Sequence, residues 1–231
     1  MRHKEHHGSG VGFELRDIIL GGQDGLVNVL GVLLAIAAAT TSTKIVIIAG
    51  LAATFAESIS MAAVAYTSTK AQIAHYKREM EREKSEMREV PEIERQEIRE
   101  IFYKKGFRGR LLDQIVKKIT SSKKLWLSTM MKEELNLNEE HENPIRSACV
   151  VGFSAIVGSL IPLIPFIFMG VHDAIIASLL ISVSVLFASG IAKAKLTVGK
   201  LLQSGIEMAV IGMGAALIGY GIGILMNALL A

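Results

Sequence analysis

Apolar residues gather in five long runs along this chain, at residues 18–39, 45–66, 148–169, 174–194 and 206–230. Each run has about 20 residues or more, which at 1.5 Å per residue is enough for a helix to cross a hydrocarbon layer of about 30 Å. A long polar segment separates the second run from the third. The pattern predicts an all-α polytopic membrane protein with five transmembrane helices and a large insert between helices 2 and 3.

The insert is itself helical by pattern. Residues 68–88 contain neither Pro nor Gly, so the second transmembrane helix is predicted to continue out of the membrane. Pro91 breaks this helix and suits the first turn of the next one. We expect further helices at about 92–104, 110–119 and 124–135. The chain is thus predicted to consist of an N-terminal tail with helices 1 and 2 (1–71), a cytoplasmic helical domain (72–144) and helices 3 to 5 (145–231).

Basic residues predict the orientation. Residues 71–146 hold 17 of the 25 Lys and Arg residues, and the head before the first run adds Arg2, Lys4 and Arg16. By the positive-inside rule both segments lie in the cytoplasm, so five spans place the N-terminus inside and the C-terminus outside. The same 71–146 segment holds 15 Asp and Glu residues, and this near-neutral balance is not typical of nucleic-acid binding.

The sequence has no motif typical of an enzyme. We find no nucleophile with its base, no phosphate-binding loop and no Cys/His spacing for zinc. Cys149 is the single cysteine, which excludes an intramolecular disulfide. We therefore expect a protein that is not an enzyme and holds no permanent cofactor.

Asp24 is a carboxylate inside the first apolar run. An ionisable group at membrane depth costs about 2.5 to 3.5 kcal/mol on insertion scales, so its presence favours an ion site. Asn28 follows one helical turn later, where its side chain is placed to orient Asp24. The first run is thus predicted to contribute to a path for ions.

Acidic and thioether side chains in the insert share helix faces. In the first set, Glu79, Glu83 and Glu86 are spaced i, i+4, i+7. In the second set, Glu94 and Glu97 are spaced i, i+3. In the third set, Glu134 follows Met131 by three residues and Met130 by four. Carboxylates combined with thioethers suit a transition ion such as Fe²⁺ better than Ca²⁺ or Mg²⁺. The alternative is a solvated charged face with i, i+4 ion pairs, in which both Met residues fill a core beside Trp126.

Five short motifs resemble one family. They are 22–26 (GQDGL), 58–62 (SISMA), 76–80 (YKREM), 130–135 (MMKEEL) and 162–165 (PLIP). Each is weak alone, but together they occur in order over essentially the whole chain, with five spans and the insert in the expected place. In these features the sequence is similar to the vacuolar iron transporter family.

The resemblance implies a homodimeric exporter of Fe²⁺, often of Mn²⁺ as well, that works in exchange for protons. It implies that Asp24 and Met61 line the translocation path. It also implies that the insert binds metal through a set of acidic and Met side chains, namely Glu83, Glu86, Glu94, Glu97, Met130, Met131 and Glu134.

The chain departs from the family pattern in the second run. Many relatives have Gly-Glu-Tyr where this sequence has Val64, Ala65 and Tyr66, and Glu57 stands where a small residue is expected. Glu57 lies about one helical turn from Met61. It is either a replacement ligand or proton carrier, or a buried structural hydrogen-bonding group.

The predicted function is proton-coupled export of Fe²⁺ and also of Mn²⁺, with Co²⁺ and Zn²⁺ as further candidate cargo and with lipid, metal ions and protons as partners. Protonation of the pathway carboxylates would release the metal outside. A divalent metal channel and a non-transporting membrane metal sensor are the alternatives. A compact chain without a targeting extension favours a prokaryotic plasma membrane, or a vacuolar membrane in a eukaryote.

Overall fold

The computed structural model describes residues 9–137, 143–196 and 199–230. Arg2 and Lys4 of the basic head and the linker residues 138–142 lie outside the described part. The chain forms two compact units, which we call the membrane unit (Met1–Thr67 with Glu142–Ala231) and the insert (Ser68–His141). All regular elements in the described residues are helical, which confirms the all-α fold class.

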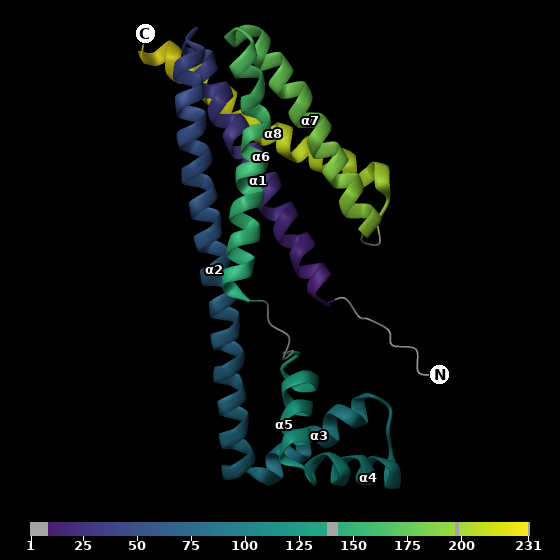
Figure 1. Ribbon diagram of the computed structural model, residues 1–231. Coiled ribbons are helices and arrows are strands. Elements are labelled where there is room, and N and C mark those ends of the chain that lie inside the picture. The colour runs from purple at the N-terminus through teal and green to yellow at the C-terminus, as the bar shows by residue number, and fades with distance from the viewer. Residues whose placement is uncertain (1–8, 138–142, 197–198, 231) are drawn as a thin grey trace, which may run out of the picture. The chain divides into compact units, whose positions relative to one another are not determined.

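Within the described residues, five helices are long and apolar enough to cross a membrane. They are α1 (Ser9–Ala39), α2 (Thr43–Glu89), α6 (Pro144–Phe168), α7 (Val171–Leu196) and α8 (Leu201–Leu230). The five predicted spans are therefore confirmed. Figure 1 shows α2 as one uninterrupted helix, as the absence of Pro and Gly after residue 67 predicted.

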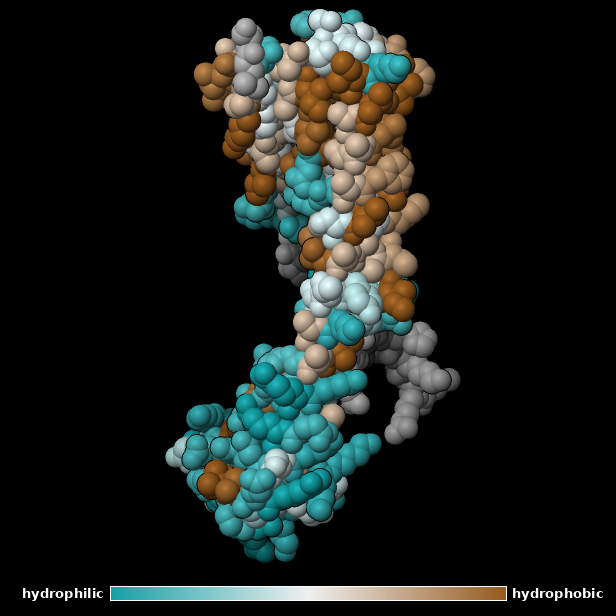
Figure 2. All heavy atoms as spheres, turned by 90° about the vertical axis from the view of Figure 1, so that its left-hand side faces the viewer, coloured by the Kyte–Doolittle hydropathy of each residue, from teal (hydrophilic) through white to brown (hydrophobic). Residues whose placement is uncertain are grey.

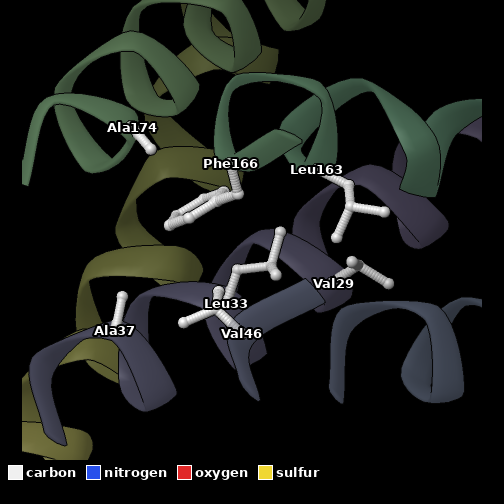
Figure 3. Close-up of a cluster of buried hydrophobic side chains, with 7 residues drawn as sticks. All are labelled: Val29, Leu33, Ala37, Val46, Leu163, Phe166 and Ala174. Carbon is white, nitrogen blue, oxygen red and sulfur yellow. The ribbon is translucent and has the colours of Figure 1, made fainter. Parts of the chain in front are cut away.

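Helix α1 is the centre of the membrane unit. It packs along α6 and α8 and also contacts α7, which in turn packs against α6 and α8. One core cluster joins four helices through Val29 and Leu33 of α1, Val46 of α2, Leu163 and Phe166 of α6 and Ala174 of α7 (Figure 3). The outward sides of these helices are largely hydrophobic (Figure 2), as expected of a surface that faces lipid.

Glycine allows α1 and α6 to approach closely. A Cβ atom on Gly25 would lie 2.4 Å from the Ala155 carbonyl oxygen, and one on Gly158 would lie 2.1 Å from the Gly22 carbonyl oxygen. No side chain fits at such distances, so backbone meets backbone in this crossing. Small residues favour this kind of close packing between membrane helices.

The insert contains the end of α2 and a compact set of short helices. These are α3 (Pro91–Lys104), α4 (Gly109–Thr120), α5 (Lys123–Thr129) and η1 (Met130–Glu134). Pro91 occupies the first turn of α3, and Gly106 adopts a φ of 98° just after its end. A core of Ile98, Leu112 and Trp126 with their neighbours holds the helices together.

The structure differs from the sequence prediction at 124–135. One continuous α-helix was expected there, but α5 ends at Thr129 and one π-helical turn follows. In this turn the Leu135 N–H donates to the Met130 carbonyl, an i+5 bond, at 3.2 Å. The wider turn changes the angles between the Met130, Met131 and Glu134 side chains from those that i+3 and i+4 spacing gives in an α-helix.

Candidate functional site

Three of the predicted pathway residues meet between α1 and α2 in the membrane unit. The Asn28 Nδ2 atom donates to Glu57 Oε1 at 3.0 Å. The Glu57 carboxyl also lies near the Asp24 carboxyl. Two neighbouring carboxylates repel each other when both are ionised, so this pair is suited to hold a proton or a cation.

The position of Asp24 follows from the glycines beside it. Gly21 and Gly25 lie against the backbone of α6, at Val151 and Ala155, and a Cβ atom at Gly21 would lie 2.2 Å from the Val151 carbonyl oxygen. Because this face of α1 is held tightly on α6, the Asp24 side chain projects from a rigid segment. The motif thus combines a packing function with a chemical group.

The membrane unit does not cover this polar group by itself. Asn28 is exposed, whereas Asp24, Glu57 and Met61 are half-buried. Apolar neighbours on α2 are also open, and Ile59 keeps 70% of its surface exposed. Met61 follows Glu57 by one helical turn on the same helix. The arrangement leaves two carboxyls and an amide on a face that another molecule, or water, must cover within a bilayer.

Asp17 is a buried acidic residue that the sequence reasoning missed. It is 1% exposed, accepts a hydrogen bond from Ser147 Oγ at 2.6 Å and pairs with Arg16 Nη2 at 2.8 Å. These bonds join α1 to the start of α6. Its spacing of i, i+7 from Asp24 places both on one helix face, and this spacing could have identified it.

Three carboxylates in the insert are buried, namely Glu79, Glu83 and Glu94. Glu83 on α2 is 1% exposed and Glu94 on α3 is 3% exposed. The Oε2 atom of each has no hydrogen-bond partner among the described residues. Buried carboxylate oxygens without partners are costly, so these groups require either a proton or a cation. The solvated-face alternative is therefore wrong for Glu83 and Glu94.

The surrounding carboxylates perturb one another. Burial, followed by the negative charges of Glu97 and Glu83, raises the pKa of Glu94 to about 7. Glu134 keeps an exposed surface, yet partial loss of hydration and the charges of Glu97 and Glu83 raise its pKa to about 7 as well. Burial, followed by the charge of Glu86, raises the pKa values of Glu83 and Glu97. Mutual repulsion of this kind shows that these predicted residues lie near one another.

Glu79 belongs to a different arrangement. Its Oε2 atom lies 2.6 Å from Arg82 Nη1, and Oε1 lies 3.1 Å from Arg78 Nη2. Arg82 also approaches Glu83 at 3.4 Å and Glu86 at 3.6 Å. We call Glu83, Glu86, Glu94, Glu97 and Glu134 the acidic group. Arg82 contacts two of its members, Glu83 and Glu86, at distances longer than its distance to Glu79.

The two predicted thioethers are both buried. Met130 is 0% exposed and belongs to the insert core with Trp126, so the core-filler interpretation applies to it. Met131 is 3% exposed and lies outside that core cluster. The π turn holds the two residues next to each other at its start, close in sequence to Glu134.

The acidic side chains do not converge fully. Among the described residues, no group of three or more His, Cys, Asp or Glu side chains has the geometry to hold a metal ion. Ionised carboxylates repel one another, so a cation would have to draw them together by side-chain rotation. The chemistry of the set, hard oxygens with a nearby thioether, suits a divalent transition ion.

Comparison with known proteins places the chain. Residues 15–224 match the family described as the VIT family. The "Vacuolar iron transporter" of Centaurea cyanus is 34% identical over 224 residues, which cover 95% of this chain and 90% of the relative. "Vacuolar iron transporter 1" of Arabidopsis thaliana is 35% identical over 212 residues, covering 91% and 84%. The "Vacuolar iron transporter" of Plasmodium falciparum is 29% identical over 224 residues, covering 92% and 82%. These names describe transporters and not enzymes, in agreement with the sequence expectation. The similarity over nearly the full length of each protein shows that this chain belongs to the VIT family.

Proposed function

We propose that this membrane protein is a proton-coupled antiporter that exports Fe²⁺, and also Mn²⁺, from the cytoplasm. The observation that carries the proposal is the group formed by Asp24, Asn28 and Glu57 within two membrane-spanning helices. Carboxylates at this depth mark ion and proton paths in membrane proteins. The names of the relatives refer to iron, which supports Fe²⁺ as a cargo.

The pair of carboxyls supports exchange of a metal for protons. When both are ionised, Asp24 and Glu57 offer two negative oxygen donors to a cation, and Met61 adds a softer sulfur one turn away. Protonation removes most of the attraction for the cation. Protons that enter from the outer side would therefore displace the metal there, and loss of these protons to the cytoplasm would restore metal affinity.

The insert serves as the capture site in this proposal. Buried Glu83 and Glu94 lack partners for one oxygen each, and a divalent cation would satisfy both. Glu86, Glu97 and Glu134 lie nearby with open surface for exchange with water. Because the pKa values of Glu94 and Glu134 are about 7, cation binding would compete with protons near neutral pH.

We further propose a homodimer with the N-terminus and the insert in the cytoplasm. Asn28 is exposed, and Asp24 and Glu57 are half-buried, so a second copy that faces α1 and α2 would shield them from lipid. The two copies together would then line one path with twice the number of carboxylates. The basic content of 71–146 supports the cytoplasmic position of the insert.

Purified protein in liposomes tests the proposal. The vesicles would contain one dye that metal quenches and a second dye that reports pH, with a pH gradient imposed across the membrane. Antiport predicts metal entry together with proton exit, and dependence of the metal flux on the gradient. Metal flux that ignores the gradient would instead show a channel. Metal binding without flux would show a sensor.

A further inference from the structure

A cavity of about 800 Å³ lies in the insert, among the end of α2, the start of α3, the end of α4 and α5. Its charged lining residues are all basic, namely Lys84, Arg88, Arg95, Lys123 and Lys124. Among the residues that the structure describes, no Asp or Glu lines it. The volume falls within the range of about 300 to 1,000 Å³ that is usual for small-molecule sites.

The basic side chains are only partly neutralised. Lys84 pairs with Glu81 and Arg95 with Glu92, each at 2.6 Å. Arg88, Lys123 and Lys124 make no ion pair within the described part of the chain. Three like charges gathered around one hollow repel one another, so this arrangement favours an anion between them.

Trp126 supplies an independent observation. Its ring lines the cavity and is 5% exposed, but its Nε1 atom has no hydrogen-bond acceptor among the described residues. Buried indole N–H groups usually have a partner. The Arg95 guanidinium lies 5.7 Å from the centre of this ring and adds a second planar donor. The lining thus has a buried N–H that lacks an acceptor beside the cations that make no ion pair in the described residues.

The basic cavity is also separate from the acidic group. Both use α2 and α3, but Glu83, Glu86, Glu94 and Glu97 are absent from the residues that line the cavity. The three unpaired cations therefore do not serve to neutralise the buried carboxylates. Their function is open to a ligand of the opposite charge.

We propose that this cavity binds a multiply charged phosphate group. Arg forms bidentate bonds with phosphate oxygens and Lys binds them as a point charge, and both residue types are present here. The phosphate would come either from a soluble phosphate compound or from the headgroup of a phosphorylated lipid. Binding requires neither metal nor transport, so it is independent of the proposed antiport.

The test uses inorganic triphosphate as the probe and the full-length, metal-free protein in detergent. Trp126 is the single Trp of the chain, so its fluorescence reports directly on the cavity. We expect a saturable heat of binding by calorimetry together with a fluorescence change of the same midpoint. A combined Arg88→Gln, Lys123→Gln and Lys124→Gln variant should weaken binding by about tenfold or more, because it removes three charge-assisted contacts.

A matched control removes the same number of charges elsewhere on the insert. Lys104, Lys117 and Lys118 are exposed and do not line the cavity, so their replacement by Gln should leave the affinity within about twofold. Equal weakening in both variants would reduce the interaction to non-specific attraction and overturn the proposal. Absence of a saturable heat with the parent protein would overturn it as well.

Nanodiscs distinguish the two sources of phosphate. If discs with a phosphoinositide lipid reduce the apparent affinity for triphosphate, relative to discs of phosphatidylcholine alone, the lipid headgroup occupies the cavity. If the affinity is the same in both, the site serves a soluble phosphate compound. Either result retains the phosphate site and assigns its source.

Discussion

The membrane unit and the insert each hold a group of acidic side chains, but they compensate the negative charge differently. In the membrane unit, Glu57 accepts a hydrogen bond from Asn28 and lies against Asp24. In the insert, Glu83 and Glu94 are almost fully buried, and each keeps one oxygen without a partner. The carboxyls of the membrane unit thus have polar neighbours, whereas the two oxygens without partners in the insert still need a proton or a cation.

This difference favours different tasks for the two groups. A pair of neighbouring carboxyls becomes less negative when it binds a proton, and its attraction for a cation then falls. Such a pair is therefore suited to the transfer and release of a metal ion. Buried carboxylates without partners gain most when a cation arrives, because the cation satisfies oxygens that water cannot reach. We therefore assign release to the membrane unit and capture to the insert within the proposed function.

The largest expected effect is that of Asp24→Asn, which should abolish the function of the membrane unit and leave that of the insert unchanged. The amide is nearly isosteric and inserts more easily than a carboxylate, but it neither carries a negative charge nor titrates. We expect complete loss of proton-coupled metal flux in liposomes, with metal binding by the insert unchanged. Retained coupled exchange would move the essential role to Glu57, and Glu57→Gln is the variant to measure next.

A second variant affects the insert and not the membrane unit. It replaces Glu83, Glu86, Glu94 and Glu97 by Gln. Loss of four negatively charged ligands should weaken Fe²⁺ or Mn²⁺ binding by about 100-fold. Groups that only orient metal ligands already change metal affinity by up to about that factor when they are removed. Calorimetric titration measures this. A matched variant replaces four exposed glutamates of α2 and α3 by Gln: Glu81, Glu89, Glu92 and Glu100. Equal losses in both variants would mean that overall charge, and not a site, attracts the metal.

The pH dependence of metal binding should also distinguish the groups. The pKa values of Glu94 and Glu134 are about 7 in the metal-free insert, so both are largely protonated at pH 6 and ionised at pH 8. We expect the affinity for Mn²⁺ to fall by about tenfold as the pH drops from 8 to 6, since each lost charge weakens the attraction. Calorimetry at fixed ionic strength measures this, and Glu94→Gln should flatten the profile.

Met61→Leu sharpens the comparison by removing only a sulfur atom from the membrane unit. Leu keeps the volume, so the packing of α2 changes little. If the thioether is a ligand, transport of Fe²⁺ should fall severalfold and transport of Mn²⁺ should fall less, because sulfur prefers the softer ion. Equal transport of both metals by the variant and the parent protein would make Met61 a packing residue.

The smallest expected effect concerns stability of the metal-free insert. The pKa of Glu94 is about 7 in the fold against an ordinary value of 4.5, so the folded state binds this proton more tightly than the unfolded state does. The free energy of unfolding should therefore fall as the pH rises from about 6 to 7, by about 1 kcal/mol. Urea unfolding followed by Trp126 fluorescence measures it. Glu94→Gln should be more stable than the parent protein at pH 7.5, and a less stable variant would contradict the account.

Much of the architecture follows from local properties of the sequence. The length of the five apolar runs, the continuation of α2 beyond the membrane and the break at Pro91 depend only on hydrophobicity and on backbone preferences of neighbouring residues. The approximate positions of α3 and α4 follow in the same way. Asp24 could be identified as unusual from sequence because a carboxylate in lipid needs compensation, whichever partner supplies it.

Only the tertiary structure decided which acidic residues are buried and what they touch. Their spacing along α2 predicts the same role, metal binding, for Glu83 and Glu86. In the structure, however, Glu83 is 1% exposed whereas the Glu86 side chain is 41% exposed. The bond from Asn28 to Glu57, the π turn at Met130 and the burial of Asp17 against Ser147 also arise from packing. These features depend on contacts between residues far apart in the chain, and a period along one helix carries no information about the surface that will cover it.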